Sequence, residues 1–281
     1  MPVASTGSAK RRRDASVTLE PEVGEVLDLA KQLAREAGAL QRERFETTFE
    51  IQTKSSSIDL VTEVDHACER AIIEALESKR PGDGVLSEEG HGREIAGCEW
   101  RWVIDPLDGT TNYAHGYPRF CVSIGVERAG VREVAAVYDP LLDELYHAVR
   151  GHGAWLDERR LSVSGQEQLG LALVATGFAY DVHRSSSDNA ACFARMLKAA
   201  RGIRRDGSAA LDLCYVAAGR LDAYWEFKLH AWDVAAGILI VEEAGGCVTA
   251  AEGDSVPADG SSVVATNGHL HTAVLDRIQD T

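Results

Sequence analysis

"RWVIDPLDGTTNYAHG", residues 101–116, is the stretch that decides the fold. The apolar run 102–104 is typical of a buried strand, and two acids follow it at once. We expect the strand to end at Asp105, because Pro106 forbids a helix there and Asp108 begins a turn that opens the next helix. The two carboxylates then converge on one point.

Amphipathic helices precede this stretch, and a sheet surrounds it. Apolar residues at spacings of three and four predict a helix from Pro21 to about Phe45 and a second over 62–79. Short β-rich runs over 84–150 predict a mostly antiparallel or mixed sheet. Beyond Val163, helices and strands alternate, with helices expected at 189–200, 208–219 and 232–246 and a strand at 221–227. Two sub-regions, 20–163 and 164–281, are therefore expected within one domain, 20–281.

Composition limits the classes of function. Of 281 residues, 45% are hydrophobic and 26% are charged, as in ordinary soluble globular proteins. The net charge of −15, from 44 acids against 29 bases, repels a nucleic-acid backbone, so direct nucleic-acid binding is not expected. No run approaches the roughly 18 apolar residues of a membrane span, so no membrane partner is expected either.

The N-terminus and the cysteines indicate the cellular compartment in which the protein is expected. Residues 1–19 are small, polar and basic, and we interpret them as a flexible arm; a trimmed organelle-targeting segment and an expression remnant are the alternatives. The six cysteines lie in apolar stretches without a C-x-x-C pair, which predicts neither a zinc site nor a disulfide framework. A reducing cytoplasmic location is expected, or an organelle stroma if the arm is a targeting segment.

Two more acids stand where an apolar element meets a polar turn. Glu88 follows the run 84–87, and Asp233 opens an apolar helix. Taken singly, Glu88 is explained as a solvated loop acid, Asp108 as a helix N-cap and Asp233 as a helix-start residue. Taken together with Asp105, they form a set of carboxylates that would repel one another unless a cation neutralised them. All-oxygen ligation suits Mg²⁺ before Mn²⁺ or Ca²⁺.

Five motifs follow one another along the chain. They are "DLVTEVD" (59–65), "SEE" (87–89), "IDPLDGTTNY" (104–113), "GSAALDLCYVAAGRLDAYWE" (207–226) and "WDVAAG" (232–237). In this order they resemble the motifs of the inositol monophosphatase family, from about Glu20 to the C-terminus. The resemblance implies an α/β (α+β) fold, the layered α/β/α/β/α sandwich of inositol monophosphatase and fructose-1,6-bisphosphatase. It also implies a lithium-sensitive, Mg²⁺-dependent phosphomonoesterase that forms a homodimer.

The resemblance further implies roles for individual acids. Glu88, Asp105 and the main-chain carbonyl of Leu107 would hold one Mg²⁺. Asp105 would bridge to a second ion, which Asp108 and Asp233 also hold. A third, weaker ion would lie near Glu88, mostly held by water, and Mn²⁺ is a substitute. Two such ions polarise a phosphoryl group, lower the pKa of water and steady the leaving alkoxide, so no covalent intermediate is needed.

The same resemblance adds Thr110 and Asp65 to Glu88 as catalytic residues. The backbone N–H groups of Gly109 and Thr110 would receive the phosphate at a helix start, where anions are favoured. Thr110 and Asp65 match a threonine–aspartate pair that helps to activate the attacking water. Asp65 is equally well explained as part of a capping box with Thr62.

Two positions near Glu88 need separate comment. Lys54 matches a family lysine in a loop near the metals, although a solvated, flexible lysine is an equal alternative. Ser87 stands where the family usually has glycine. We expect this difference to alter the local turn and to leave the Glu88 carboxylate available.

Substrate recognition is implied at both ends of the site. Asp108, Gly109 and Thr110 would meet the phosphate, and the residues that would meet an inositol ring are Ala209, Glu226 and Asp233. A carboxylate at Glu226 suits vicinal hydroxyls, since it accepts two hydrogen bonds; an exposed strand-end acid is the alternative. The expected substrate is myo-inositol monophosphate.

Other functions stay open, because the metal-binding acids determine the reaction, hydrolysis of a phosphate ester, but not which alcohol carries the phosphate. Related members act on histidinol phosphate, fructose 1,6-bisphosphate or 3′-phosphoadenosine 5′-phosphate. Some bacterial relatives also associate with the transcription machinery, so a regulatory binding protein is the alternative from another class. The presence of all the metal acids favours the enzyme.

Overall fold

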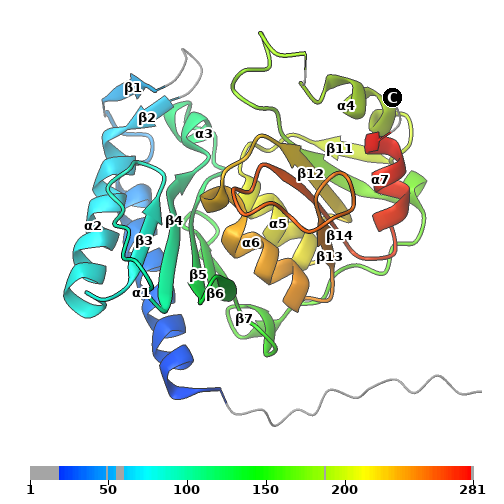
Figure 1. Ribbon diagram of the computed structural model, residues 1–281. Helices are drawn as coiled ribbons and strands as arrows, with labels where there is room; N and C mark the ends of the chain where they lie inside the picture. Colours follow the sequence, from blue (N-terminus) through cyan, green and yellow to red (C-terminus); the bar gives the residue numbers. More distant parts are fainter. Residues whose placement is uncertain (1–18, 49, 55–59, 187, 280–281) are drawn as a thin grey trace, which may run out of the picture.

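Layers of helix, sheet, helix, sheet and helix succeed one another across the molecule (Figure 1). The computed structural model describes residues 19–48, 50–54, 60–186 and 188–279. The layer order agrees with the α/β/α/β/α sandwich that the family resemblance implies. The expected arm, 1–19, lies outside the described residues apart from Leu19.

The first layer consists of the two N-terminal helices, α1 (Pro21–Arg44) and α2 (Glu63–Lys79). Their buried residues recur at three- and four-residue spacing and face the first sheet, where they share one hydrophobic core with it. Thr62 caps α2, as predicted, because its hydroxyl accepts from the backbone N–H of Val64. Both predicted helices are confirmed.

The larger sheet is mixed, as expected. Its seven strands lie in chain order, and only β3 and β4 of the neighbouring pairs run parallel. The strands are β3 (Gly84–Ser87), β4 (Trp100–Asp108), β5 (Cys121–Arg128), β6 (Val131–Asp139), β7 (Glu144–Val149), β8 (Gly153–Leu156) and β9 (Arg159–Arg160). The decisive stretch therefore forms a central strand, with the helix α3 (Thr110–Ala114) directly after it.

Two helices, α5 (Ala209–Ala217) and α6 (Ala231–Glu243), separate the two sheets. Both are apolar along almost their whole length, because they are covered on opposite sides. The smaller sheet has the order β11-β10-β12-β14-β13. Its strands are β10 (Leu173–Thr176), β11 (Gly202–Arg204), β12 (Ala223–Phe227), β13 (Cys247–Thr249) and β14 (Ser262–Thr266).

The outer layer and the small elements complete the chain. The helices α4 (Ala190–Leu197) and α7 (His271–Gln279) cover the far face of the smaller sheet through a third core. The remaining elements are β1 (Ile51–Thr53), β2 (Leu60–Thr62) and the 3₁₀ turn η1 (Leu169–Leu171). The helices and the strand expected beyond Val163 are thus present, with ends that differ by at most three residues.

The predicted division into 20–163 and 164–281 stays a prediction. The larger sheet lies before this boundary and the smaller sheet after it. However, α6 packs against strands of both sheets, and its buried residues belong to one core that both sheets share. Among the described residues, no helix is both long and apolar enough to cross a membrane.

Candidate active site

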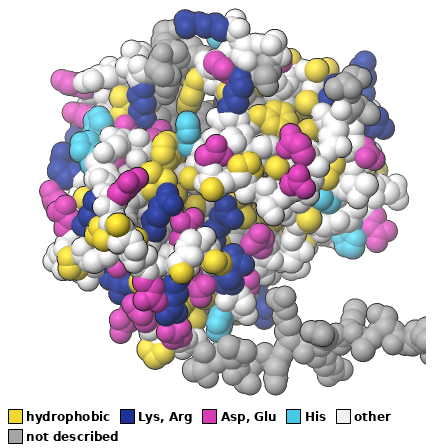
Figure 2. Space-filling model, viewed as in Figure 1, with side chains coloured by type: hydrophobic (Ala, Val, Ile, Leu, Met, Phe, Trp, Pro, Cys, Tyr) yellow, Lys and Arg dark blue, Asp and Glu magenta, His cyan; other side chains and the backbone are white. Residues whose placement is uncertain are grey.

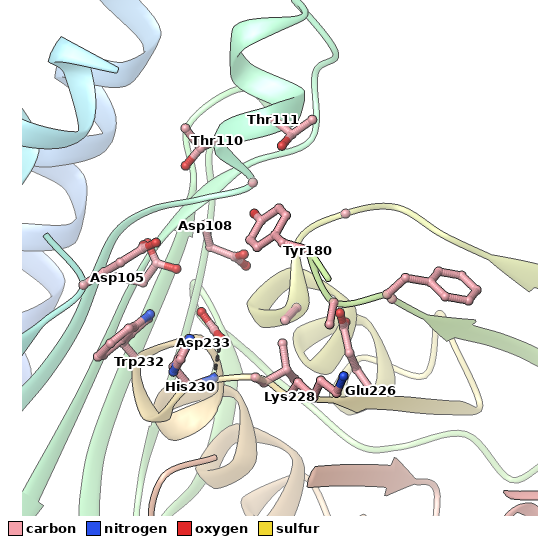
Figure 3. Close-up of a pocket in the computed structure, with 18 of the residues that line it drawn as sticks. Asp105, Asp108, Thr110, Thr111, Tyr180, Glu226, Lys228, His230, Trp232 and Asp233 are labelled. Carbon is pink, nitrogen blue, oxygen red and sulfur yellow. Dashed lines mark hydrogen bonds between the residues drawn. The ribbon is translucent and has the colours of Figure 1, made fainter. Parts of the chain in front are cut away.

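A pocket lies where β4 ends and the helices α3, α5 and α6 begin (Figure 3). Most of the residues predicted for the site line it: Glu88, Asp105, Leu107, Asp108, Gly109, Thr110, Ala209, Glu226 and Asp233. In Figure 3 the side chains of Asp105, Asp108 and Asp233 point toward one another. Asp65 does not line the pocket but contacts Thr110, which does. The fold thus gathers residues that are up to 168 positions apart, from Asp65 to Asp233.

A β-bulge places Asp105 and Asp108 on the same side of the sheet. We expected the strand to end at Asp105, but β4 continues to Asp108. Asp105 pairs with Ser123 and Asp108 with Cys121, so β4 uses one residue more than β5 between these two pairs. In a regular strand, side chains three apart point to opposite faces; the extra residue reverses this. This is why both carboxylates enter one pocket.

The helix N-cap interpretation of Asp108 is wrong. Gly109 caps α3, and no side chain caps that helix. Instead Asp108 Oδ2 accepts hydrogen bonds from Ser208 Oγ at 2.7 Å and from the backbone N–H of Ala210 at 2.8 Å. Asp108 therefore binds the start of α5, a helix 100 residues further along the chain. Burial raises the pKa of Asp108 to about 6, and the bond from Ser208 opposes that rise.

Asp105 has much less compensation for its charge. It is 2% exposed, and its Oδ1 accepts from the backbone N–H of Leu107 at 2.9 Å. Burial raises its pKa well above the ordinary value, and the charges of Glu88, Asp108 and Asp233 add to this. The pKa of Asp233 is also raised well above its ordinary value by burial and by the charge of Glu88. The centre of the pocket is thus strongly electronegative.

Glu88 and Lys54 form an ion pair at the edge of the pocket. Lys54 Nζ donates to Glu88 Oε1 at 2.9 Å and to Glu89 Oε1 at 2.6 Å. The Glu88 side chain is 23% exposed and Lys54 24%, so neither the solvated-acid nor the solvated-lysine interpretation holds. Burial lowers the pKa of Lys54, but the two carboxylates raise it on balance. Ser87 is buried, and its carbonyl accepts from Gly90, which closes the turn that presents Glu88.

Asp65 forms the capping box considered for it and also contacts Thr110. Its Oδ2 accepts from the backbone N–H of Thr62 at 2.8 Å and from the Thr62 hydroxyl at 2.6 Å, which completes a capping box. Its Oδ1 accepts from Thr110 Oγ1 at 2.9 Å. Thr110 Oγ1 also lies 3.0 Å from the carbonyl oxygen of Leu107. The start of α2 therefore holds the hydroxyl that lines the pocket.

Gly109 allows the chain to turn sharply after β4. Its φ is +101°, a left-handed conformation that favours glycine. A Cβ there would lie 2.8 Å from the carbonyl oxygen of Arg119. Any side chain at position 109 would therefore collide with backbone and displace the start of α3.

Glu226 lies at the opposite end of the pocket from Thr110 (Figure 3). Its Oε2 accepts from the Tyr224 hydroxyl at 2.6 Å, and burial raises its pKa to about 7. The exposed strand-end interpretation is therefore wrong. Gly177 makes room for this carboxylate, since a Cβ at that position would overlap it.

Several pocket residues were missed by sequence reasoning. Tyr180, Arg205 and Lys228 line the pocket, together with the stacked rings of His230 and Trp232, whose centroids are 4.8 Å apart. A weak signal existed for Lys228, in the segment "YWEFKLHAWD" between two site acids. Its positive φ of 58° and its ion pair with Asp181 at 2.7 Å depend on tertiary packing and leave no pattern in the sequence.

The donor set fits hard divalent cations. Carboxylate side chains and Leu107 line the pocket, and burial together with the neighbouring acids raises the pKa values of Asp105 and Asp233, an effect that a bound cation would oppose. Oxygen ligands of this kind are those that Mg²⁺ prefers. Glu88, Asp105, Asp108, Asp233 and the Leu107 carbonyl are the groups able to hold such ions.

Comparison with known proteins agrees with this geometry. The sequence profile of the inositol monophosphatase family matches residues 22–281. An inositol-1-monophosphatase of Rhizobium meliloti (strain 1021) is 42% identical over 266 residues, 94% of this chain and 97% of that protein. The Nus factor SuhB of Pseudomonas aeruginosa is 44% identical over 259 residues, 90% of this chain and 96% of that protein.

A solved structure shows the same arrangement. Inositol monophosphatase from Anabaena (Nostoc) sp. PCC 7120 superimposes with a TM-score of 0.83 at 39% identity, over 92% of this chain and 96% of that one. Profile, relatives and structure all cover almost the whole chain. The chain therefore belongs to the inositol monophosphatase family and is a phosphomonoester hydrolase.

Proposed function

We propose that this protein hydrolyses myo-inositol monophosphate to inositol and phosphate with Mg²⁺ and without a covalent intermediate. One observation carries the proposal: a single pocket contains a carboxylate cluster, with Thr110, which contacts Asp65, on one side and the carboxylate of Glu226 on the other. Ions, water and alcohol would thus have separate places.

The carboxylates would hold the ions as the family motifs imply. Glu88, Asp105 and the Leu107 carbonyl suit the first ion, and Asp105, Asp108 and Asp233 suit the second, with a third near Glu88. Bound Mg²⁺ would supply Lewis-acid charge that polarises the phosphoryl group and lowers the pKa of water. The bulge supports this assignment, because it brings Asp105 and Asp108 to one side of the sheet.

The Thr110–Asp65 pair is proposed to position and deprotonate the attacking water. The Thr110 hydroxyl has one proton, which it donates to Asp65, and its free lone pairs accept from water. Asp65 is fully buried and keeps two further donors from Thr62. Those bonds hold its carboxylate in place while a proton moves toward it through Thr110.

The substrate would lie between the two ends of the pocket. Backbone N–H groups of Gly109 and Thr110 are proposed to receive the phosphate, with Asp108 beside them. The ring hydroxyls would then face Ala209, Asp233 and Glu226, all of which line the pocket. A carboxylate held by the Tyr224 hydroxyl retains lone pairs for vicinal hydroxyls.

Family membership supports further proposals about this protein. We infer that Mn²⁺ substitutes for Mg²⁺, that lithium inhibits, and that the protein forms a homodimer. A cytoplasmic or stromal location is proposed for it.

The direct test is phosphate release from a panel of esters, each with Mg²⁺ and with EDTA. The panel contains inositol 1-phosphate, histidinol phosphate, fructose 1,6-bisphosphate and 3′-phosphoadenosine 5′-phosphate. We expect the highest kcat/KM with inositol 1-phosphate and no turnover with EDTA. A higher kcat/KM for another ester would make that ester the substrate in place of inositol 1-phosphate. Full turnover in EDTA would refute the metal mechanism.

A second candidate function is association with the transcription machinery. It is favoured by the similarity to proteins named Nus factor SuhB. On the face drawn in Figure 2, acidic and basic side chains are interspersed, so a protein partner suits this surface better than nucleic acid. Gel filtration of the protein with purified RNA polymerase tests this: co-elution supports the association, and separate elution at micromolar concentrations of both refutes it.

A further inference from the structure

A second group of metal-ligating side chains lies outside the active-site pocket. His66 and Glu69 stand three residues apart on α2 and therefore share one face of that helix. His91 joins them from the loop that follows β3. One ligand atom from each residue lies within 4.8 Å of the other two. The two imidazole rings meet edge to face, with centroids 6.0 Å apart and planes at 88°.

The cluster contains buried polar atoms that the described part of the chain leaves unsatisfied. Glu69 is 0% exposed; its Oε2 contacts Nδ1 of His91, whereas its Oε1 has no hydrogen-bond partner there. Nδ1 of His66 is likewise buried and has no such partner. A buried carboxylate oxygen and a buried imidazole nitrogen are costly to leave unpaired. Both atoms would be satisfied by one cation placed between the three side chains.

The surroundings give a cation access to this cluster. A pocket that opens at the surface contains His66 and His91, and its other lining residues are Arg70, Ile73, Glu74 and Glu77. Two of these are acids, which outnumber the single arginine. The His91 side chain is 66% exposed, so one ligand of the cluster faces solvent and is free to adjust.

We propose that His66, Glu69 and His91 form a site for a transition metal, best suited to Zn²⁺ and separate from the Mg²⁺ pocket. Imidazole nitrogens favour zinc over magnesium, which prefers oxygen. Two histidines and one carboxylate supply three ligands and leave a fourth position for water. Neighbouring ligand atoms in a tetrahedral zinc site lie roughly 3.3 Å apart, so the direct contact between His91 and Glu69 would open slightly to admit the ion, which the exposed His91 is free to do.

Cysteine spacing did not reveal this site, because none of its three ligands is a cysteine. Its position also matters for the active site. His66 adjoins Asp65, and His91 lies three residues after Glu88. A bound ion therefore ties the first turn of α2 to the loop that presents Glu88. We expect zinc to stabilise this corner of the fold and to raise the melting temperature.

The test is equilibrium dialysis of the full-length protein against Zn²⁺ in a large excess of Mg²⁺, which occupies the carboxylate pocket. Wild type is compared with His91→Ala, with His66→Ala and with His269→Ala as a control at an exposed histidine elsewhere. Asp105→Asn tests whether any of the bound zinc lies among the carboxylates of the active site, because such zinc would be lost in this variant. We expect both cluster variants to lose at least about tenfold in zinc affinity, because second-shell changes alone cost 10- to 100-fold. His269→Ala and Asp105→Asn should bind like wild type.

Two readouts keep the proposal open to refutation. X-ray absorption at the zinc edge should show two imidazole ligands in wild type and fewer in His91→Ala. Zinc should raise the melting temperature of His269→Ala and not that of His91→Ala. Unchanged zinc affinity in both cluster variants would overturn the proposal. Loss of zinc in Asp105→Asn with retention in His91→Ala would also overturn it, since the ion would then lie among the carboxylates.

Discussion

Asp105 and Asp108 have the same side chain and similar burial, but their charges are compensated differently. Asp108 receives two hydrogen bonds at the start of α5, from Ser208 and Ala210. Asp105 receives one, from Leu107, and its pKa is raised by burial and by the acids around it. Its ionised form therefore depends most on a cation.

Replacing Asp105 by Asn should lower kcat by several orders of magnitude at saturating Mg²⁺, because the proposed bridging ligand loses its charge for both ions. The protein should stay folded. Without metal the variant should melt at a higher temperature than wild type, since one buried charge has been removed. Steady-state kinetics and thermal unfolding in EDTA check both parts. Turnover close to that of wild type would contradict the metal assignment.

Glu226 allows binding of the alcohol to be separated from chemistry. Glu226→Gln should lower kcat/KM for inositol 1-phosphate by roughly 10- to 100-fold, since each charge-assisted hydrogen bond contributes about 1.5–3 kcal/mol. Turnover of an aryl phosphate should be nearly unchanged, because its ring has no hydroxyls for Glu226 to meet. Equal losses of kcat/KM on the two substrates would show that Glu226 acts on metal binding or on folding.

The same substitution should change how stability depends on pH. Burial raises the pKa of Glu226 to about 7 in the folded protein, against an ordinary value of 4.5. Between these values the folded state holds the proton and the unfolded state does not, so this group makes stability fall as pH rises through that window. Relative to wild type, metal-free Glu226→Gln should gain on the order of 3 kcal/mol from pH 4.5 to pH 7.5.

Denaturant unfolding in EDTA at several pH values measures this difference directly. Other titrating groups are common to both proteins and cancel in the comparison. A difference in unfolding free energy that stays constant from pH 4.5 to pH 7.5 would show that Glu226 has an ordinary pKa in the folded state.

At the scale of elements, the bulge in β4 depends on α1. Gln41 of that helix is fully buried, and its Nε2 donates to the carbonyl oxygen of Pro106 at 2.8 Å and to that of Cys121 at 3.3 Å. These carbonyls lie on the two strands beside the bulge. A helix that contributes no residue to the pocket lining thus holds the strand irregularity that orients Asp105 and Asp108.

Gln41→Leu should therefore affect both stability and activity. Two buried carbonyls lose their donor, which should cost about 1–3 kcal/mol of unfolding free energy. A relaxed bulge should also lower kcat and weaken Mg²⁺ affinity, while KM changes less. Gln32→Leu, an exposed position on the same helix, is the matched control and should behave like wild type. If Gln41→Leu lowers the unfolding free energy but leaves kcat and Mg²⁺ affinity unchanged, the bulge does not depend on this contact.

The elements differ in how well the sequence predicts them. Helical spacing was enough for α1 and α2, because one apolar face per helix leaves a periodic pattern. The bulge left no such pattern: Asp105 was predicted at the end of the strand, and only pairing with β5 shows that β4 continues. The attachment of Asp108 to Ser208 joins residues 100 positions apart, which no local signal predicts. The pocket residue Arg205 was missed for the same reason.

At the scale of the whole molecule, the candidate ligands come from different layers. Asp105 and Asp108 lie in β4 of the larger sheet, and Glu88 directly follows β3 of the same sheet. Asp233 lies in the first turn of α6, between the two sheets. The family motifs predicted these acids by position, but their convergence requires that α6 pack on β4, β5 and β6. The proposed ion of Asp105, Asp108 and Asp233 would therefore join two layers and would bind only the folded protein.

Mg²⁺ should consequently stabilise the fold as a whole. An ion that binds only the folded state adds about 2.7 kcal/mol at a hundredfold excess over its Kd, which corresponds to a melting shift of roughly 5 °C for a chain of this size. The net charge of −15 means that any salt also stabilises by screening, so the titration is run at constant ionic strength with KCl. Asp105→Asn should show a much smaller shift. Equal shifts in the two proteins at matched ionic strength would mean that Mg²⁺ acts elsewhere than at the carboxylate cluster.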